Sequence, residues 1–555
     1  MNDVGTDPQK SETSGSPEQL GMVVSGTLTG GLDIRLNPSI SIEEIKVGQY
    51  VTITGERCRF LGMITDIKLG SAGPNLEETP PDVADPFIGK IIIGTATYGI
   101  IHVTPMLVIG GEVSAILEGP QPVKTIPGHF SPVLTSSQRD IDMVFGQEDE
   151  RRFHVGNPLD METKICLNME EFIKRSNGVF GKSGTGKTFL ARLLLLGMLQ
   201  KGKAANLVFD MHNEYGWEGT SEGRGKVKGL KQLFPSRVAV FSLDEENSRR
   251  RGVTTDAIIK IGWNEVEPED IVLLATTLNL TETAQQAIYQ FAREFGDSRW
   301  LENVINFDRS KEEGKSLLER LNIPDSTFRN LKRGIDTLRR LPFLVPETSA
   351  NSVQRIMEHL ERGNHVVVEF GRFNNIAAYM LVANMLTRRI HDRYRENTER
   401  AIAENKPVSH PLVITIEEAH KFLDPGVADQ TIFGIIAREM RKYNVTLLVI
   451  DQRPSAIDPE VMSQIGTKLT CLLDNEKDVE AVLTGVPGKN ELKAVLSRLE
   501  TRQQALIFGH AVPMPVVIKT REYGTPESYK AFGFRDSNEL KTKVLEDKKD
   551  LWDSL

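Results

Sequence analysis

One glycine-rich segment constrains the fold more than any other part of this 555-residue chain. Residues 181–188 read GKSGTGKT and fit the pattern G-x-x-x-x-G-K-[ST], in which backbone N–H groups surround phosphate oxygens at the start of a helix. Residues 178–180 before the segment predict a short strand, and residues 189–200 after it predict a helix. The segment therefore predicts a phosphate-binding loop, which belongs in a parallel sheet covered by helices.

The sequence after residue 163 agrees with that prediction, because apolar strands alternate with amphipathic helices. The strands that we expect lie at 206–210, 238–241, 365–370, 412–416, 445–450, 469–473 and 504–508. Helical periodicity dominates residues 256–361. We therefore predict an α/β core in two parts, 136–255 and 362–522, that is interrupted by a helical insertion over 256–361.

The two ends of the chain differ from this core. Residues 1–21 are polar and rich in Gly, Pro, Ser and Thr, which predicts a disordered tail. Residues 22–135 contain short β-branched runs separated by Gly and Pro, which predicts a small β-barrel with a long loop at 73–86. Residues 523–555 are polar and highly charged, and predict either a solvated helix or an arm that packs on a neighbour.

Composition limits the environment and the partners of the chain. The net charge of -9 excludes a surface that is basic throughout. The three cysteines, Cys58, Cys166 and Cys471, have neither a disulfide framework's density nor zinc-ligand spacing. No apolar stretch reaches the roughly 18 residues of a membrane span, and the N-terminus lacks a signal-peptide pattern. We therefore expect a cytoplasmic protein with no membrane contact.

The phosphate-binding loop and one acidic strand predict the main features of a nucleotide site. Lys187 is expected to reach the β- and γ-phosphates, and the Thr188 hydroxyl to bind Mg²⁺. The strand ending in Glu417-Glu418 supplies carboxylates at the ligand-binding edge of the sheet, so we assign Glu417 to Mg²⁺ through water and Glu418 to polarising the attacking water. The predicted nucleotide contacts are Gly181, Lys182, Ser183, Gly184, Thr185, Gly186, Lys187 and Thr188.

A third strand, 445–450, is followed by Asp451-Gln452-Arg453. We predict that Gln452 senses the γ-phosphate or holds the attacking water, while Arg453 has a salt bridge as its alternative role. Arg438 and Arg441 precede this strand and share one helix face because they lie three residues apart. They are candidates for an arginine finger that crosses a subunit boundary, and an ordinary solvated helix face remains the alternative.

The segment DMHNEY follows the strand at 206–210. Its position predicts polar side chains at the rim of the same site. We interpret Asp210, His212 and Glu214 as residues that support the nucleotide site, with capping and turn formation as the alternative.

Together these motifs resemble the HerA branch of the FtsK-HerA group of hexameric DNA-pumping ATPases. The resemblance rests on GKSGTGKT, DMHNEY, ITIEEAH at 414–420 and the segment IAREMRKYNVTLLVIDQRPSAIDPEVMSQIGTKL, together with the β-rich N-terminus. It covers roughly residues 22–522. It implies a RecA-like P-loop ATPase core, an N-terminal barrel of the HAS-barrel type, and ATP with Mg²⁺ as cofactors.

The resemblance also implies a function and partners. We expect a homo-hexamer that threads double-stranded DNA and acts with a nuclease of the NurA type, or with a sirtuin-like or nuclease effector of phage defence. The channel candidates are Arg224, Lys226 and Lys228, for which an ordinary solvated loop is an equal alternative. The alternative function is an oligomeric scaffold whose nucleotide state activates a bound effector with little DNA pumping.

Overall fold

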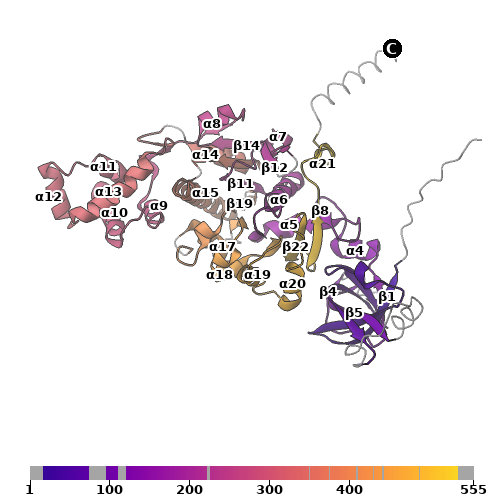
Figure 1. Ribbon diagram of the computed structural model, residues 1–555. Helices are drawn as coiled ribbons and strands as arrows, with labels where there is room; N and C mark the ends of the chain where they lie inside the picture. The colour runs from indigo at the N-terminus through magenta and orange to yellow at the C-terminus, as the bar shows by residue number, and fades with distance from the viewer. Residues whose placement is uncertain are drawn as a thin grey trace, which may run out of the picture.

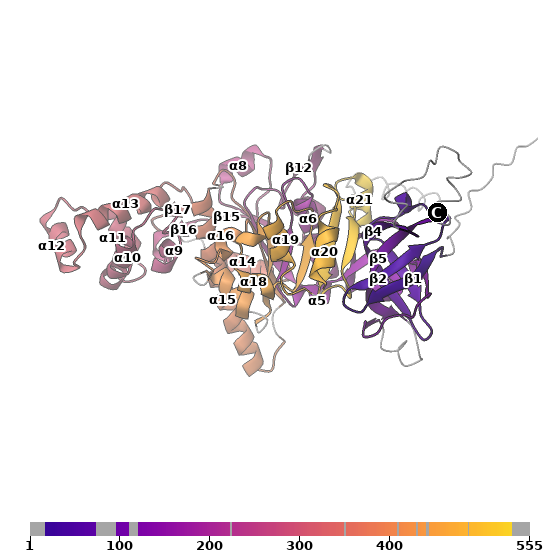
Figure 2. The ribbon, with the colours of Figure 1, turned by 60° about the horizontal axis from the view of Figure 1, so that its bottom comes forward.

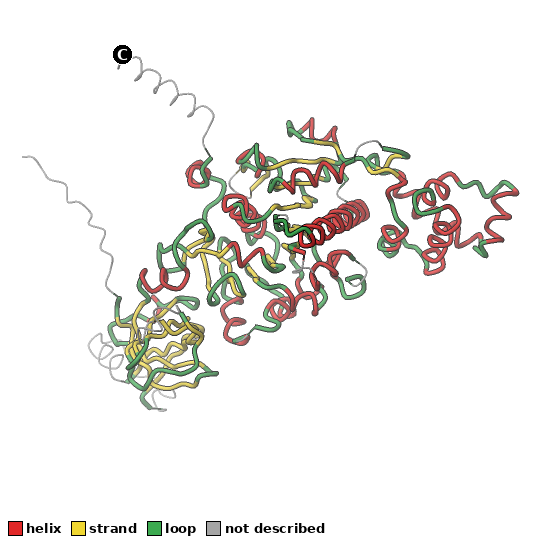
Figure 3. Tube along the Cα trace, turned by 180° about the vertical axis from the view of Figure 1, so that it is seen from behind, coloured by secondary structure: helices red, strands yellow, loops and turns green. Residues whose placement is uncertain are grey.

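The computed structural model describes residues 17–73, 96–109, 120–221, 225–348, 351–373, 375–407, 410–428, 431–439, 443–486 and 488–534. These residues form a β-barrel, a large α/β layer and a helical lobe. The barrel and the lobe lie at opposite ends of the α/β layer, as two views show (Figures 1 and 2). Seen from behind, the barrel is built of strands and loops, whereas the lobe consists of helices and loops (Figure 3).

The N-terminal barrel is closed, because strand β2 pairs with β1 on one side and with β5 on the other. Its strands are β1 (Gln19–Thr27), β2 (Gly31–Leu36), β3 (Tyr50–Thr54), β4 (Arg59–Ser71), β5 (Thr97–Ile109), β6 (Gln121–Pro122) and β7 (Pro132–Thr135). Inward side chains such as Ile34, Ile53 and Ile101 are completely buried. Strand β1 begins inside the predicted tail 1–21, since Leu20 already packs into this core. The predicted loop at 73–86 lies almost wholly outside the described residues.

The α/β layer contains a twelve-stranded sheet in the order β15-β14-β18-β11-β19-β20-β10-β21-β22-β23-β8-β9. The strands are β8 (Arg152–Asn157), β9 (Ile165–Asn168), β10 (Asn177–Phe180), β11 (Ala205–Asp210), β14 (Val238–Ser242), β15 (Ala257–Ile258), β18 (His365–Glu369), β19 (Leu412–Glu417), β20 (Val445–Asp451), β21 (Thr467–Thr470), β22 (Gln504–Gly509) and β23 (Val516–Thr520). From β15 to β21 neighbouring strands are parallel, and the remaining pairs are antiparallel.

The strand order determines where the site can form. Strand β10, which precedes the phosphate-binding loop, pairs with β20 and β21, whereas the next strand in the chain, β11, pairs with β18 and β19. The acidic strand β19 is thus separated from β10 by β20. The carboxyl ends of all these parallel strands meet at one edge of the sheet. This arrangement is the predicted RecA-like core.

Helices cover both faces of the sheet. They include α5 (Met169–Ile173), α6 (Lys187–Lys201), α7 (Leu230–Leu233), α8 (Glu245–Arg250), α15 (Ile376–Ala403), α16 (His420–Leu423), α17 (Ile432–Glu439), α18 (Pro459–Gln464), α19 (Glu476–Val482), α20 (Lys489–Leu496) and α21 (Pro526–Ala531), and the short helix α4 (Gln138–Phe145) joins the barrel to the sheet. Helix α6 is buried on every side from Leu190 to Leu199, as its continuous apolar sequence requires. In the part of the chain that the structure describes, no helix is long and apolar enough to cross a membrane.

The helical lobe is shorter than the predicted insertion 256–361. It comprises α9 (Pro268–Val272), α10 (Glu282–Phe295), α11 (Trp300–Asn306), α12 (Glu312–Arg320) and α13 (Asp325–Arg339). Strand β15 extends the main sheet, and helix α14 (Ser352–Glu361) packs against β18 and β11. Helical periodicity could not reveal this boundary, because α14 has the same amphipathic pattern as the lobe helices. The short strands β16 (Ile261–Gly262) and β17 (Leu344–Val345) pair at the base of the lobe.

The C-terminal segment also differs from its prediction as a solvated helix or an arm on a neighbour. Residues 523–534 fold back onto the core of the same chain, where Tyr523 packs edge-on against Phe189. The Gln200 side chain donates a hydrogen bond to the Phe532 carbonyl at 2.8 Å. The aromatic side chains of this segment account for its packing. Residues 535–555 lie outside the described part of the chain.

Trp300 holds the helical lobe together, and its replacement should destabilise that lobe. Its side chain is completely buried, and its indole N–H donates to the Val266 carbonyl at 3.0 Å. Trp300→Ala should cost about 3–5 kcal/mol of local unfolding free energy, because it leaves a large cavity. Hydrogen exchange measured over α10–α13 should accelerate accordingly, while exchange in the barrel stays the same. Trp300→Phe is the matched control and should show a smaller effect. Unchanged exchange in the alanine variant would contradict this account of the lobe.

Candidate functional site

The phosphate-binding loop joins β10 to α6 in a conformation that needs its glycines. Gly181, Gly184 and Gly186 have φ values of 151°, 77° and 98°. A Cβ on Gly181 would lie 2.8 Å from the Cβ of Cys471 and 2.9 Å from the Thr185 hydroxyl. At Gly181 the loop therefore passes too close to the residue after β21 for any larger side chain. It ends at the first turn of α6, where free N–H groups point toward the cavity.

The two lysines of the loop have different surroundings. The Lys187 ammonium donates to the Lys182 carbonyl at 2.7 Å. Burial lowers the pKa of Lys187, and the nearby carboxylates of Glu417, Glu418 and Asp451 counteract this shift. Lys182 instead points outward and forms an ion pair with Asp474 at 2.8 Å. Of these two side chains, Lys187 is the one placed to act on phosphate charge.

Glu417 ends strand β19 and is bracketed by two tyrosines. The Tyr215 hydroxyl donates to Glu417 Oε1 at 3.0 Å, and the Tyr379 hydroxyl donates to the Glu417 carbonyl at 3.0 Å. The other carboxylate oxygen, Oε2, is buried and has no hydrogen-bond partner among the described residues. Burial raises the pKa of Glu417 well above its usual range, and the charges of Asp210 and Glu214 add to that shift. A cation beside Oε2 would favour the ionised form.

Glu418 and Gln452 meet at the mouth of the cavity, although they follow different strands. Gln452 Nε2 donates to Glu418 Oε1 at 3.2 Å. Glu418 has φ of 49°, a left-handed conformation that is costly for a residue with a side chain. Such strain is often found at functional sites. The structure thus brings together the two residues to which the sequence assigned the attacking water.

Asp451, which ends strand β20, connects the loops that carry these two residues. Its buried carboxylate accepts the backbone N–H of His420 at 2.7 Å, the His420 ring Nδ1–H at 2.9 Å and the backbone N–H of Arg453 at 2.7 Å. No sequence motif had assigned a role to Asp451. The available signal was an acidic residue at the end of an uninterrupted apolar strand. The Arg453 side chain is exposed and forms no ion pair with any described residue.

Asp210 shapes the DMHNEY segment and does not line the cavity. Its carboxylate is fully buried and accepts the backbone N–H groups of Glu214, Tyr215 and Gly216 at 2.7, 2.8 and 3.2 Å. Asp210 therefore has the turn-forming role that the sequence left as an alternative. His212 and Glu214 do line the cavity.

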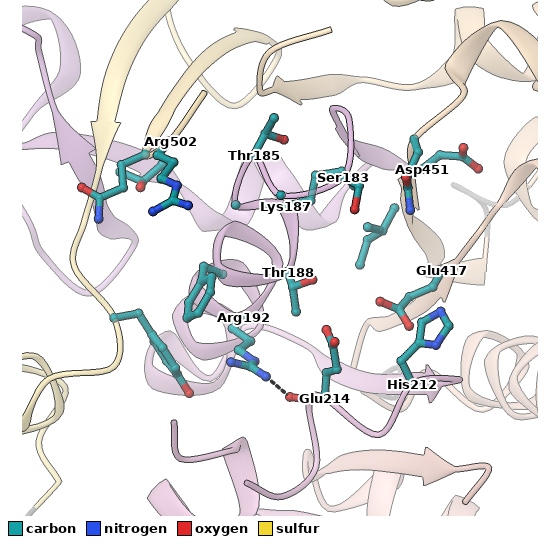
Figure 4. Close-up of a pocket in the computed structure, with 18 of the residues that line it drawn as sticks. Ser183, Thr185, Lys187, Thr188, Arg192, His212, Glu214, Glu417, Asp451 and Arg502 are labelled. Atoms are coloured by element: carbon teal, nitrogen blue, oxygen red, sulfur yellow. Dashed lines mark hydrogen bonds between the residues drawn. The ribbon is translucent and has the colours of Figure 1, made fainter. Parts of the chain in front are cut away.

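The cavity has a volume of about 490 Å³ and extends well beyond the phosphate-binding loop. Figure 4 shows the loop residues in its middle, Glu417 on one side and Arg502 on the other. The wall around Arg502 comes from the ends of β22 and β23 and includes Arg502, Gln503, Thr520, Arg521, Glu522 and Tyr523. Sequence reasoning missed this wall, because no motif links residues 502 and 523 to a loop at 181–188.

Other predicted residues lie away from the cavity. Arg438 is 3.6 Å from Asp458 and 3.6 Å from Glu460 and does not line the cavity. Lys226 forms an ion pair with Glu218 at 3.1 Å, and the Lys228 ammonium lies 3.8 Å from the ring centroid of Phe534. Arg224 and Arg441 lie outside the described residues. The finger and channel assignments therefore stay predictions.

Comparison with known proteins gives matches over most of the chain. The family model described as "Helicase HerA, central domain" matches residues 153–390, and the "HAS barrel domain" model matches residues 20–114. The "DNA double-strand break repair helicase HerA" of Sulfolobus acidocaldarius is 24% identical over 90% of this chain and 93% of the relative. The protein of the same name from Saccharolobus solfataricus is 22% identical over 86% of this chain and 87% of the relative.

Two solved structures are similar to this chain at lower identity. VirB4 of Thermoanaerobacter pseudethanolicus is 16% identical, with a TM-score of 0.46 over 68% of this chain and 98% of that chain. The bacterial conjugative coupling protein TrwB is 11% identical, with a TM-score of 0.45 over 71% of this chain and 94% of that chain.

Asp210→Asn should destabilise the segment that carries His212 and Glu214. An amide in place of the carboxylate loses acceptor capacity and brings an N–H₂ group against backbone N–H donors. We expect the free energy of unfolding to fall by about 1–3 kcal/mol, measured by urea denaturation followed by circular dichroism. His212→Ala is the control on the same segment, and its exposed side chain predicts unchanged stability. Equal stability of the two variants would show that the three hydrogen bonds do not hold the segment.

Proposed function

The chain belongs to the HerA family, and on that premise we propose that it is an ATP-hydrolysing translocase or helicase that acts on double-stranded DNA. The similarity to relatives named as DNA repair helicases extends over most of their length and of this chain. The observation that carries the proposal is one cavity in which Lys187, Glu417, Glu418 and Gln452 converge around a phosphate-binding loop.

ATP fits the two ends of this cavity. Its phosphates would lie against the N–H groups of the loop and the first turn of α6, with Lys187 exchanging its Lys182 carbonyl contact for phosphate oxygens. The nucleoside would extend toward the wall at Arg502 and Gln503. The volume of about 490 Å³ falls within the usual range of small-molecule sites.

Mg²⁺ fits the acidic end of the cavity. Thr188 and Glu417 line the same cavity, Glu417 Oε2 has no hydrogen-bond partner among the described residues, and hard oxygen ligands suit this ion. When bound, the ion neutralises phosphate charge. The buried Glu417 would hold it through water, and Tyr215 would keep the carboxylate oriented.

Glu418 is the proposed general base. Its carboxylate would orient and polarise a water molecule for attack on the γ-phosphate, and Gln452 would fix the carboxylate through the hydrogen bond of 3.2 Å. Because Gln452 lies at the end of β20, a change at the γ-phosphate would reach this strand directly. Asp451 ties the same strand to the loop after Glu417 and would transmit that change.

We further propose that the chain assembles as a homo-hexamer around DNA. Arg438 and Arg441 remain our candidates for a finger that completes the neighbouring site. The barrel at the far end of the molecule from the helical lobe offers exposed loops on a rigid scaffold, which suits docking of a nuclease or a sirtuin-like effector (Figure 1).

Substitutions in the cavity should separate ATP binding from hydrolysis. Lys187→Ala should abolish measurable turnover, since it removes the cation that acts on phosphate charge. Glu418→Gln should lower kcat by about 10²–10⁴-fold while ATP binding persists, because the amide keeps the size but not the basicity of the carboxylate. Steady-state phosphate release and calorimetric nucleotide titration measure the two effects.

A matched control for the Glu418 variant is Glu313→Gln, the same change on an exposed part of the helical lobe, which should retain wild-type turnover. Turnover of Glu418→Gln within twofold of wild type would refute its role as the base.

DNA should control the ATPase if the protein is a motor. Linear duplex DNA should raise kcat severalfold. This stimulation should fade between about 50 and about 200 mM salt, because counterions then replace the protein's contacts with DNA phosphates. A scaffold would instead respond to its effector protein and ignore duplex DNA. Absence of DNA stimulation at low salt, with and without an effector, would favour the scaffold over the translocase.

A further inference from the structure

A hollow on the helical lobe collects positive charge far from the nucleotide cavity. Its volume is about 390 Å³. Five of its eight lining side chains are cationic and one is acidic. We call this hollow the basic hollow, and its lining residues are Arg309, Phe328, Arg329, Lys332, Arg333, Asp336, Thr337 and Arg340. This concentration contrasts with a chain of net charge -9. The proposed ATPase chemistry does not require it.

Most of the basic hollow belongs to one face of helix α13. Arg329, Lys332, Arg333, Asp336 and Arg340 follow spacings of three and four residues, which align side chains along a helix. From Arg329 to Arg340 the face extends roughly 16 Å at about 1.5 Å per residue. This length matches roughly five nucleotides of one strand in duplex DNA, at 3.4 Å per nucleotide.

The cations of the basic hollow divide into two groups. Arg309 and Arg329 both bind Asp325, at 2.7 Å and 2.8 Å respectively. Lys332 donates to the Val304 carbonyl at 3.0 Å and so caps helix α11. These three side chains are held by the lobe itself.

Arg333 and Arg340 are exposed and form no ion pair with the residues that the structure describes. They belong to the same hollow as the anchored cations. Asp336, the one acidic residue of the lining, lies 3.6 Å from Lys332, so the mutual repulsion of the five cations is only partly offset. A ligand with regularly spaced negative charge would relieve this repulsion.

The chemistry of the basic hollow favours a nucleic-acid backbone over a protein surface. Its one large apolar side chain, Phe328, is only 2% exposed and packs against Phe307 with ring centroids 4.7 Å apart. The hollow thus lacks the aromatic and apolar anchors on which protein interfaces depend. Arginine forks and a threonine hydroxyl are typical partners of phosphate oxygens.

We propose that the basic hollow of the helical lobe binds the phosphate backbone of duplex DNA. This inference rests on the proposed function, and it assigns a DNA contact to the lobe, which lies apart from the ATPase core and opposite the barrel (Figure 1). The contact positions the duplex without reading its sequence, because the hollow presents charge rather than a pattern of donors and acceptors.

The test is a double charge reversal, Arg333→Glu with Arg340→Glu, in the full chain. Binding of a fluorescent 30-base-pair duplex, about six times the length of the face, is measured by anisotropy over a series of salt concentrations. We expect at least tenfold weaker binding at low salt for any duplex sequence. The slope of log affinity against log salt should fall by about 1.8, or about 0.9 for each lost phosphate contact. ATP turnover without DNA should equal that of wild type. The milder pair Arg333→Gln with Arg340→Gln should show the same slope change with normal helical content.

Arg293→Glu with Arg299→Glu is the matched control, since both arginines are exposed on the same lobe but outside the basic hollow. The control should lose less affinity for the duplex than the Arg333/Arg340 variants, and its slope of log affinity against log salt should change less. Wild-type affinity and slope in the Arg333/Arg340 variants would overturn the inference but leave the proposed function intact if duplex still stimulates turnover. If the Arg333/Arg340 variants lose binding to polyglutamate but keep binding to the duplex, the partner is an acidic protein, and the inference is also overturned. A wild-type protein that binds no duplex would refute both proposals.

Discussion

Four neighbouring strands of the sheet each end in an acidic residue, and the site depends on how these buried charges are balanced. Asp210, Glu369, Glu417 and Asp451 end β11, β18, β19 and β20. Backbone N–H groups satisfy Asp210, Arg251 pairs with Glu369 at 2.9 Å, and His420 with two N–H groups satisfies Asp451. Burial nevertheless raises the pKa of Glu369 to about 7, with Asp210 adding to the shift. Glu417 Oε2 and Glu369 Oε1 have no hydrogen-bond partner among the described residues, and of these two side chains only Glu417 lines the cavity. The local excess of negative charge is thus left at the position where a cation and phosphates can use it.

The same buried carboxylates organise loops that follow these strands. Asp210 organises the segment that presents His212 and Glu214, while Asp451 joins the loop after Glu417 to the loop that contains Gln452. The carboxylates of Asp210 and Asp451 therefore each organise a turn rather than bind a ligand. The surrounding hydrogen bonds stabilise Glu418 in its strained left-handed conformation. Preorganisation of this kind lets charge be stabilised without rearrangement during a reaction.

Local patterns in the sequence predicted the central parallel strands of the sheet from β14 to β21, but not β8, β9 or β15. The sequence assigned both Glu418 and Gln452 to the attacking water without predicting the hydrogen bond between them. The apolar run 412–416 and the glycines of 181–188 have a local physical meaning, so strand β19 and the phosphate-binding loop could be anticipated. The wall at Arg502 and Gln503 could not be anticipated, because it depends on antiparallel strands that join the sheet some 320 residues after the phosphate-binding loop. Local sequence patterns do not encode contacts over such a separation. Helix α14 has the same periodicity as the lobe but packs on the sheet, and Tyr523 and Phe532 pack inward within a polar tail.

The pairing of β16 with β17 brings the two ends of the helical lobe side by side. Ile261 faces Leu344, and paired strands lie about 4.8 Å apart. The two strands are parallel, so the lobe forms the crossover between them, and no strand of the main sheet lies within it. The lobe is therefore an insertion between two neighbouring points of the core. Because the lobe leaves and re-enters the core at this one place, its surface can change in sequence and length without altering the strands and loops that line the nucleotide cavity.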